Sequence, residues 1–183
     1  MVSLIEPACG SCAADSTTRA VLPDGRVLVI RPMVPADRPA IAALLAGLSV
    51  ESRAHRFHSA AVRITPATLD QVTAGHVLVV ALGDHLVALG SYVARPGLSQ
   101  AELALVVADA EQGRRIGTAL GARLARDARR AGLRQLRAEV VGSNRRVLRL
   151  MRGLGCGLTS TWAFGALTVS VELCPEPVSG GTT

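Results

Sequence analysis

The chain has 183 residues, of which 49% are hydrophobic, so length and composition indicate one globular domain and exclude a fully disordered chain. All 20 basic residues are arginine, and the net charge of +6 favours an anionic partner such as a phosphorylated cofactor, a nucleic acid or an acidic surface. Neither a run of about 18 apolar residues nor a basic leader followed by an apolar stretch occurs, so we expect a cytoplasmic protein without a membrane span.

The two ends of the chain differ from its middle. Residues 1–20 and 175–183 are small, polar and without a periodic pattern, so we predict disordered tails around a domain at 21–174. Cys9 and Cys12 form a Cys-x-x-Cys pair, but a zinc site needs about four ligands and the sequence holds no second such pair. We therefore expect no metal, and four cysteines that stay reduced.

The first part of the domain predicts one strand and three helices. The β-branched run at 27–31 follows a Pro-Asp-Gly turn and is typical of a strand. Apolar residues recur on one helical face over 36–48. Ser49 is a candidate N-cap for a second helix reaching Phe57, and Thr65-Pro66 is a candidate start for a short helix ending near Thr73.

The middle and end of the domain predict eight further elements. Apolar runs at 77–82 and 86–94, separated by Gly-Asp-His, indicate a hairpin. A strand over 101–108, a helix over 118–131 and a strand over 136–141 follow. Asn144 begins a helix to Leu154 with Gly155 as its C-cap. The last hairpin joins 158–164 to 167–173 through Gly165.

This order of elements predicts an α/β fold. Antiparallel hairpins at both ends flank a central strand–helix–strand unit, and two strands joined through a helix lie parallel. The sequence therefore predicts a mixed, mostly antiparallel twisted sheet with one central parallel βαβ unit.

The segment Gln112-Gly-Arg-Arg-Ile-Gly-Thr118 lies between the central strand and its helix. The first N–H groups of a helix lack intrahelical partners and carry partial positive charge, which suits a phosphate. Two glycines let the backbone approach such a group closely, and two arginines add full charge. The segment is a candidate pyrophosphate-binding loop.

These elements and motifs resemble the Gcn5-related N-acetyltransferase superfamily over residues 26–173. Residues 101–107 resemble its fourth strand, 112–118 its pyrophosphate loop, and 144–155 its second cofactor segment. The opening segment, from Ile30-Arg-Pro to Arg56-Phe57, is similar to the acetyltransferase domains of bacterial protein-lysine acetyltransferases. The resemblance implies the acyl-CoA N-acyltransferase fold, acetyl-CoA as donor, and a small amine or a protein lysine as acceptor.

The resemblance also implies cofactor-binding positions in this chain. The loop residues that would bind pyrophosphate through backbone or side-chain groups are Gln112, Gly113, Arg114, Arg115, Ile116, Gly117 and Thr118. Val106 and Val107 match strand positions that hold the pantetheine arm, and Asn144 matches an asparagine that meets the arm from the other side.

Two carboxylates are candidates for the general base. Glu102 is a charged residue in an otherwise apolar strand, at the position where lysine-acetylating relatives place a glutamate base. Glu139, in the next strand, is the second candidate. A protonated amine with a pKa of about 10.4 must lose a proton before it attacks, which is why a base is needed. Either side chain could instead be a solvated carboxylate or an ion-pair partner of an arginine.

Two residues depart from the family pattern. Arg115 occupies the first glycine position of the loop, which a side chain tolerates if the backbone there is already helical. Met151 stands where many relatives have a tyrosine that acts as general acid. These departures leave open a non-catalytic acyl-CoA-binding domain. A nucleic-acid-binding module is a further alternative, weakened by the presence of only four aromatic residues. A homodimer is compatible with the family.

Overall fold

The computed structural model describes residues 3–5, 17–22, 24–141, 144–163 and 166–174. Cys9, Cys12 and the predicted tail at 175–183 lie outside these residues. The strands are β1 (Ser3–Ile5), β2 (Thr18–Val21), β3 (Val27–Pro32), β4 (His76–Leu82), β5 (His85–Ala94), β6 (Gln100–Val107), β7 (Gln135–Val140), β8 (Gly157–Ala163) and β9 (Ala166–Glu172). The helices are α1 (Arg38–Ala46), α2 (Val50–Phe57), α3 (Pro66–Val72), α4 (Ile116–Arg130) and α5 (Arg145–Arg152), with short 3-10 turns η1 (Pro35–Asp37) and η2 (Asp109–Glu111).

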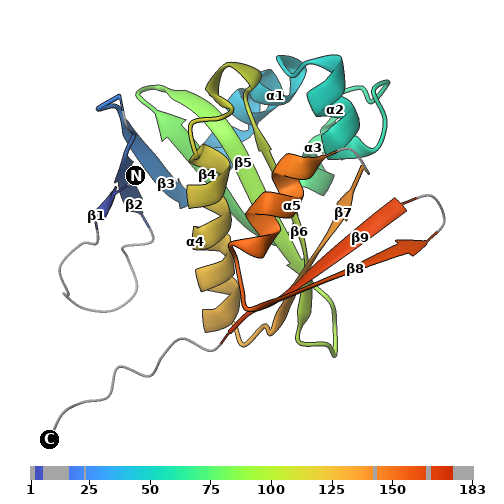
Figure 1. Cartoon of the computed structure of the whole chain (residues 1–183). Coiled ribbons are helices and arrows are strands. Elements are labelled where there is room, and N and C mark those ends of the chain that lie inside the picture. The colour runs from blue at the N-terminus through green and yellow to red at the C-terminus, as the bar shows by residue number, and fades with distance from the viewer. Residues whose placement is uncertain (1–2, 6–16, 23, 142–143, 164–165, 175–183) are drawn as a thin grey trace, which may run out of the picture.

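The described strands form one sheet in the order β1-β2-β3-β4-β5-β6-β7-β9-β8 (Figure 1). β6 and β7 are parallel and are joined through α4, while the other neighbouring strands are antiparallel. The predicted mixed sheet with a central parallel βαβ unit is therefore confirmed.

Helices cover both faces of the sheet. α4 and α5 lie in front of the sheet in Figure 1, and their residues Leu120, Leu124 and Met151 join the larger hydrophobic core. On the opposite face, Ile41 and Leu45 of α1 pack with buried strand residues in a second core. The second core contains residues of β4, β5 and β6 but none of the described residues of β7, β8 or β9. The half of the opposite face that β7, β9 and β8 form is therefore not covered by this second core.

Three expectations about local structure are corrected. β1 and three of the four residues of β2 fall within residues 1–20, where we expected no element. β2 pairs with β3, and Ala20 is completely buried. The helix expected over 36–48 is a 3-10 turn followed by α1, because the Asp37 side chain holds the Val34 N–H at 2.8 Å before the helix begins. The C-cap of α5 is Gly153 rather than Gly155.

Gly155 has a different structural role. A Cβ atom at this position would lie 1.9 Å from the carbonyl oxygen of Glu172 in β9, so only glycine allows this close approach. Cys156, the next residue, forms a disulfide with Cys174, with the two Cα atoms 5.6 Å apart. The expectation of reduced thiols is wrong for this pair, because the register of β8 and β9 brings the two cysteines together.

Candidate active site

The parallel strands β6 and β7 pair over a short stretch only. Gln100 lies opposite Gln135 and the described pairing ends where Glu102 lies opposite Arg137. Residues 103–107 of β6 continue for about 17 Å beyond that point. Apart from the Val107 carbonyl, which accepts a hydrogen bond from Gln112, their N–H and C=O groups on the β7 side are available to an extended ligand that lies along the strand.

The loop that follows β6 ends at the N-terminus of α4. Within the helix, the N–H of Ala119 donates to the carbonyl of Arg115 at 3.0 Å. The N–H groups of Ile116, Gly117 and Thr118 precede this bond, so they have no partner within the helix, and their binding of an anion stays a prediction. A Cβ at Gly117 would lie 3.5 Å from Val107, so α4 begins close to the end of β6.

The backbone at Arg115 is left-handed, with φ 64° and ψ 10°. The condition under which a side chain would be tolerated at this position, a right-handed helical backbone, is therefore not met. Gly113, two residues earlier, also has a positive φ, of 79°. A side chain at a left-handed position strains the backbone. The Arg115 side chain is exposed.

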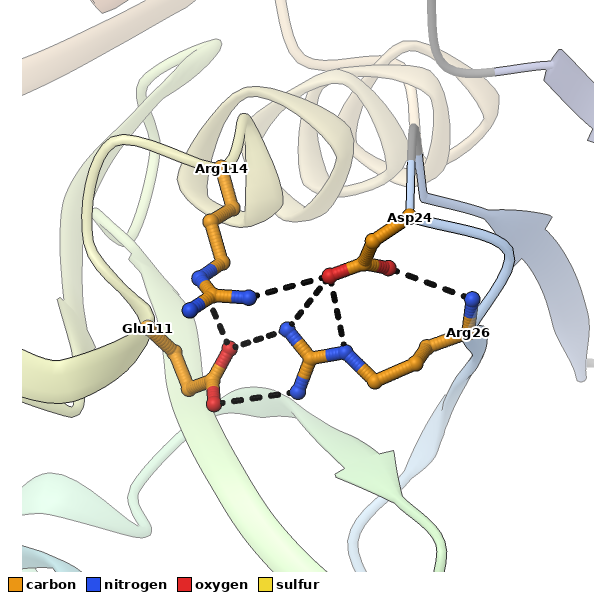
Figure 2. A network of polar contacts seen from close by, with 4 residues as sticks. All are labelled: Asp24, Arg26, Glu111 and Arg114. Carbon is orange, nitrogen blue, oxygen red and sulfur yellow. Dashed lines mark hydrogen bonds and ion pairs between the residues drawn. The ribbon is translucent and has the colours of Figure 1, made fainter.

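Arg114 belongs to a network that anchors the loop to the β2–β3 turn (Figure 2). Its guanidinium contacts Asp24 at 3.0 Å and Glu111 at 3.4 Å. Arg26 donates to both oxygens of Glu111, at 3.0 and 3.2 Å, and these bonds lower the pKa of Glu111 and raise the pKa of Arg26. The Arg114 side chain thus forms ion pairs with two carboxylates. We had expected it to be a candidate contact for phosphate.

Gln112 is also engaged by protein groups. Its side-chain amide donates to the Val107 carbonyl at 3.2 Å and to the Ser52 hydroxyl at 3.0 Å, and its oxygen accepts a hydrogen bond from Arg146. Gln112 therefore joins β6, α2 and α5 around the loop. Its role in this structure is to hold the loop in position.

Asp109 ties the start of α2 to the same loop. Its carboxylate accepts hydrogen bonds from the Ser49 N–H at 2.9 Å and from the Ser52 hydroxyl at 2.6 Å. Burial tends to raise the pKa of Asp109, but these hydrogen bonds outweigh burial and hold the pKa below its ordinary value. Ser49 is the N-cap of α2, as predicted, and its hydroxyl accepts from the Ser52 N–H.

The remaining predicted cofactor positions lie around the open end of β6. Val106 is buried and faces α1, while Val107 is partly exposed beside the start of α4. Asn144 caps α5, because its side-chain oxygen accepts from the Val147 N–H at 3.2 Å. Met151 is fully buried in the larger core. The single tyrosine, Tyr92, stacks on His76 with ring centroids 4.8 Å apart.

Both predicted carboxylates lie on the open half of the sheet. Alternation along β6 places Glu102 on the face opposite α4, and the buried neighbours of Glu139 place it on the same face of β7. Both side chains are exposed. The residues that line a small hollow here are Arg95, Glu102, Arg137, Ala138, Glu139 and Thr168. The structure thus brings the two candidate bases together, at the point where β6 and β7 stop pairing.

Residues of the α2 segment contact this hollow. His58 Nδ1 lies 3.8 Å from a carboxylate oxygen of Glu139. Burial lowers the pKa of Arg56, and attraction to Glu102 partly offsets that effect, so the two charges lie within electrostatic reach of each other. The sequence analysis missed Arg56, Arg95 and Arg137. Strand alternation would have placed Arg137 on the face of Glu139, but only the fold reveals the other two.

No group of three or more His, Cys, Asp or Glu residues within the described ranges could hold a metal ion. None of the helices that the structure describes is both long enough and apolar enough to cross a membrane.

The chain is similar to known proteins in its sequence pattern and in its fold. The model of the acetyltransferase (GNAT) family matches residues 46–156. No curated protein gives a significant sequence match. The GNAT domain of S. lividans PAT is similar in structure, with a TM-score of 0.77 and 25% identity over 89% of this chain and 100% of that one.

Two further solved structures share the fold at lower similarity. A Salmonella typhimurium protein solved with its cofactor acetyl-CoA has a TM-score of 0.59 and 24% identity, covering 85% of this chain and 99% of that one. A cAMP-binding acyltransferase from Mycobacterium smegmatis has a TM-score of 0.56 and 24% identity, covering 86% of this chain and 47% of that one. Because the family match spans most of the chain and includes β6, the loop and α5, this protein belongs to the acetyltransferase (GNAT) family.

Proposed function

We propose that this protein transfers the acetyl group of acetyl-CoA to a lysine side chain of another protein, with Glu102 as general base. The observation that carries the proposal is the end of β6–β7 pairing at Glu102, where an open strand edge meets an exposed carboxylate. The choice of a lysine rests on the resemblance of the opening segment to protein-lysine acetyltransferases, and the likeness to the S. lividans PAT domain supports it.

The proposed donor lies along the open edge of β6. Its pyrophosphate binds the N–H groups of Ile116, Gly117 and Thr118, where the helix dipole adds favourable charge. Its pantetheine arm then runs beside residues 103–107 as an added strand would. This direction brings the thioester towards Glu102, where the two strands meet.

The acceptor approaches from the opposite side of the sheet. Glu102 faces away from α4 and α5, towards the segment that contains Arg56 and His58. An acceptor on this face reaches the thioester through the gap between β6 and β7, while the donor phosphates stay at α4. Donor and acceptor therefore have separate routes to the reacting atoms.

Two proton transfers and two bond changes complete the proposed reaction. Glu102 takes a proton from the lysine ammonium, whose ordinary pKa of about 10.4 keeps it charged at neutral pH. The free amine attacks the thioester carbonyl carbon, the carbon–sulfur bond then breaks, and the nitrogen gives its extra proton to the departing sulfur or to water. The leaving thiol has an ordinary pKa of about 8.5, so it can depart as a thiolate without an acid from the protein. Met151, which has no proton to donate, is compatible with this route.

Replacing Glu102 with glutamine tests the proposal directly. Removal of a general base costs on the order of 10²- to 10⁴-fold in turnover, so we expect Glu102→Gln to lose acetyl transfer and to keep acetyl-CoA binding. Transfer is measured as CoA release together with acetyl-lysine formation, and binding is measured by calorimetry. The chain contains no lysine, so it contributes no acetyl-lysine side chain of its own to the signal.

Glu139→Gln is the matched control, because Glu139 is an exposed carboxylate in the same hollow. Wild-type turnover by Glu102→Gln at every pH would refute the role of Glu102, and loss of turnover only in Glu139→Gln would assign the base to Glu139. Saturable binding of acetyl-CoA without transfer to any amine or protein would favour the non-catalytic alternative. A homodimer and a cytoplasmic location stay predictions.

A further inference from the structure

Three arginines lie near Glu102, the carboxylate that would bind the acceptor amine in the proposed function. Arg137 lies directly opposite Glu102 in the strand register, Arg95 lines the same hollow, and Arg56 lies within electrostatic reach of Glu102. They come from β7, from the residue directly after β5 and from α2. We call these three residues the arginine cluster.

The arginine cluster is largely unpaired in this structure. Within the described residues, the side chains of Arg95, Arg137 and Glu102 make no hydrogen bond or ion pair. The Nε atom of Arg56 is buried and has no hydrogen-bond partner among these residues. Guanidinium groups normally gain bidentate contacts with carboxylates or phosphates, so the cluster has binding capacity that the fold does not use.

The charges of the hollow favour an acceptor of mixed charge. When Glu102 binds the lysine ammonium, the two charges offset each other. The other charged groups around the amine are the three guanidinium groups and the Glu139 carboxylate, so their net charge is positive. A second carboxylate close to the ammonium would be attracted by that excess, and a second cation would be repelled. The open strand faces, rather than an enclosed cavity, suit an extended protein segment better than a small molecule.

From this arrangement we propose that the protein selects acceptor lysines that have an acidic residue beside them. The inference rests on the proposed lysine acetylation. Glu102 binds the lysine ammonium, and the arginine cluster binds the carboxylate of the adjacent residue by charge-assisted hydrogen bonds. Lysines flanked by arginine or lysine are disfavoured, because they would bring a second cation to the cluster.

The test compares three peptides that differ only next to the acceptor lysine, with aspartate, asparagine or arginine on both sides. We expect kcat/KM to be about three- to tenfold higher for the aspartate peptide than for the asparagine peptide, and lowest for the arginine peptide. The difference should arise mainly in KM and should shrink as salt is added, because exposed charges are screened.

Variants then ask whether the arginine cluster causes the preference. Arg137→Gln and Arg95→Gln should each lower the ratio of the aspartate to the asparagine rate. Arg130→Gln, which removes an exposed charge from the end of α4 on the opposite face, should leave that ratio unchanged.

Equal kcat/KM for the three peptides would overturn the inference and leave the proposed function standing. An unchanged ratio in both Arg137→Gln and Arg95→Gln would also overturn it. Binding of acetyl-CoA without transfer to any of the lysine peptides would overturn the proposed function and the inference together.

Discussion

The left-handed backbone of Arg115 predicts that a glycine at this position would stabilise the protein. Its φ of 64° and ψ of 10° lie in the left-handed region, which costs a residue with a side chain about 1–2 kcal/mol. The Arg115 side chain is exposed and the residue directly precedes α4. We therefore attribute most of the effect of an Arg115→Gly change to the backbone.

The size of the effect follows from two opposing contributions. Glycine removes the left-handed strain, but it also loses about 0.5–1 kcal/mol more than other residues when the chain orders. The net gain for Arg115→Gly is then about 0.5–1 kcal/mol in the free energy of unfolding. In a protein of this length, such a gain corresponds to a rise of roughly 1–4 °C in Tm.

Urea unfolding monitored by circular dichroism can measure this gain. Arg115→Ala is the control, because it removes the same charge and keeps a Cβ atom in the left-handed backbone. Gly113→Ala is the reciprocal variant. It adds a Cβ at a φ of 79° with no heavy atom within 4 Å, so a loss of stability would come from backbone strain and not from a clash. If Arg115→Gly proves no more stable than Arg115→Ala, the assignment of strain to Arg115 is refuted.

Two further predictions concern the stability of the frame around the site. Asp37→Asn should lower the free energy of unfolding by about 2–3 kcal/mol, because the buried Asp37 accepts two 2.7 Å hydrogen bonds from Arg31. These bonds lower the pKa of Asp37 below its unfolded value of about 3.9. The stabilisation that Asp37 provides is therefore present above that pH and is lost as the pH falls. Urea unfolding at neutral and at acidic pH should show that the variant loses less stability on acidification than the wild type does. Gly155→Ala should cost roughly 3 kcal/mol or more in thermal unfolding, because the new Cβ meets the Glu172 carbonyl at 1.9 Å, whereas Gly153→Ala, with 3.4 Å to its nearest atom, should be nearly neutral.

The sequence predicted the elements of this fold because their signals are local. Helix caps such as Ser49 and Thr65 and the alternation of apolar residues depend on neighbours within a few positions. The open N–H groups at the start of α4 were also predictable, since every helix has them. Glu102 stood out as a lone charge in an apolar strand.

Other parts of the site depend on contacts between distant segments. The sequence could not show that Arg114 turns to Asp24, or that Gln112 is held by Ser52 and Arg146, because those partners lie at least 34 positions away. The left-handed backbone of Arg115 was missed because the loop, anchored by such contacts, sets its geometry. Local propensity carries no information about either feature.

The network in Figure 2 has a consequence for how the protein folds. It joins residues 85 and 90 positions apart, so the loop before α4 gains its anchor only after the β2–β3 turn has docked. Contacts of such long range form late when chain closure is costly. The stretch that matches the family, 46–156, includes Glu111 and Arg114 but neither Asp24 nor Arg26. A chain shortened to those limits would keep the sequence of the loop and lose the two residues that hold it in place.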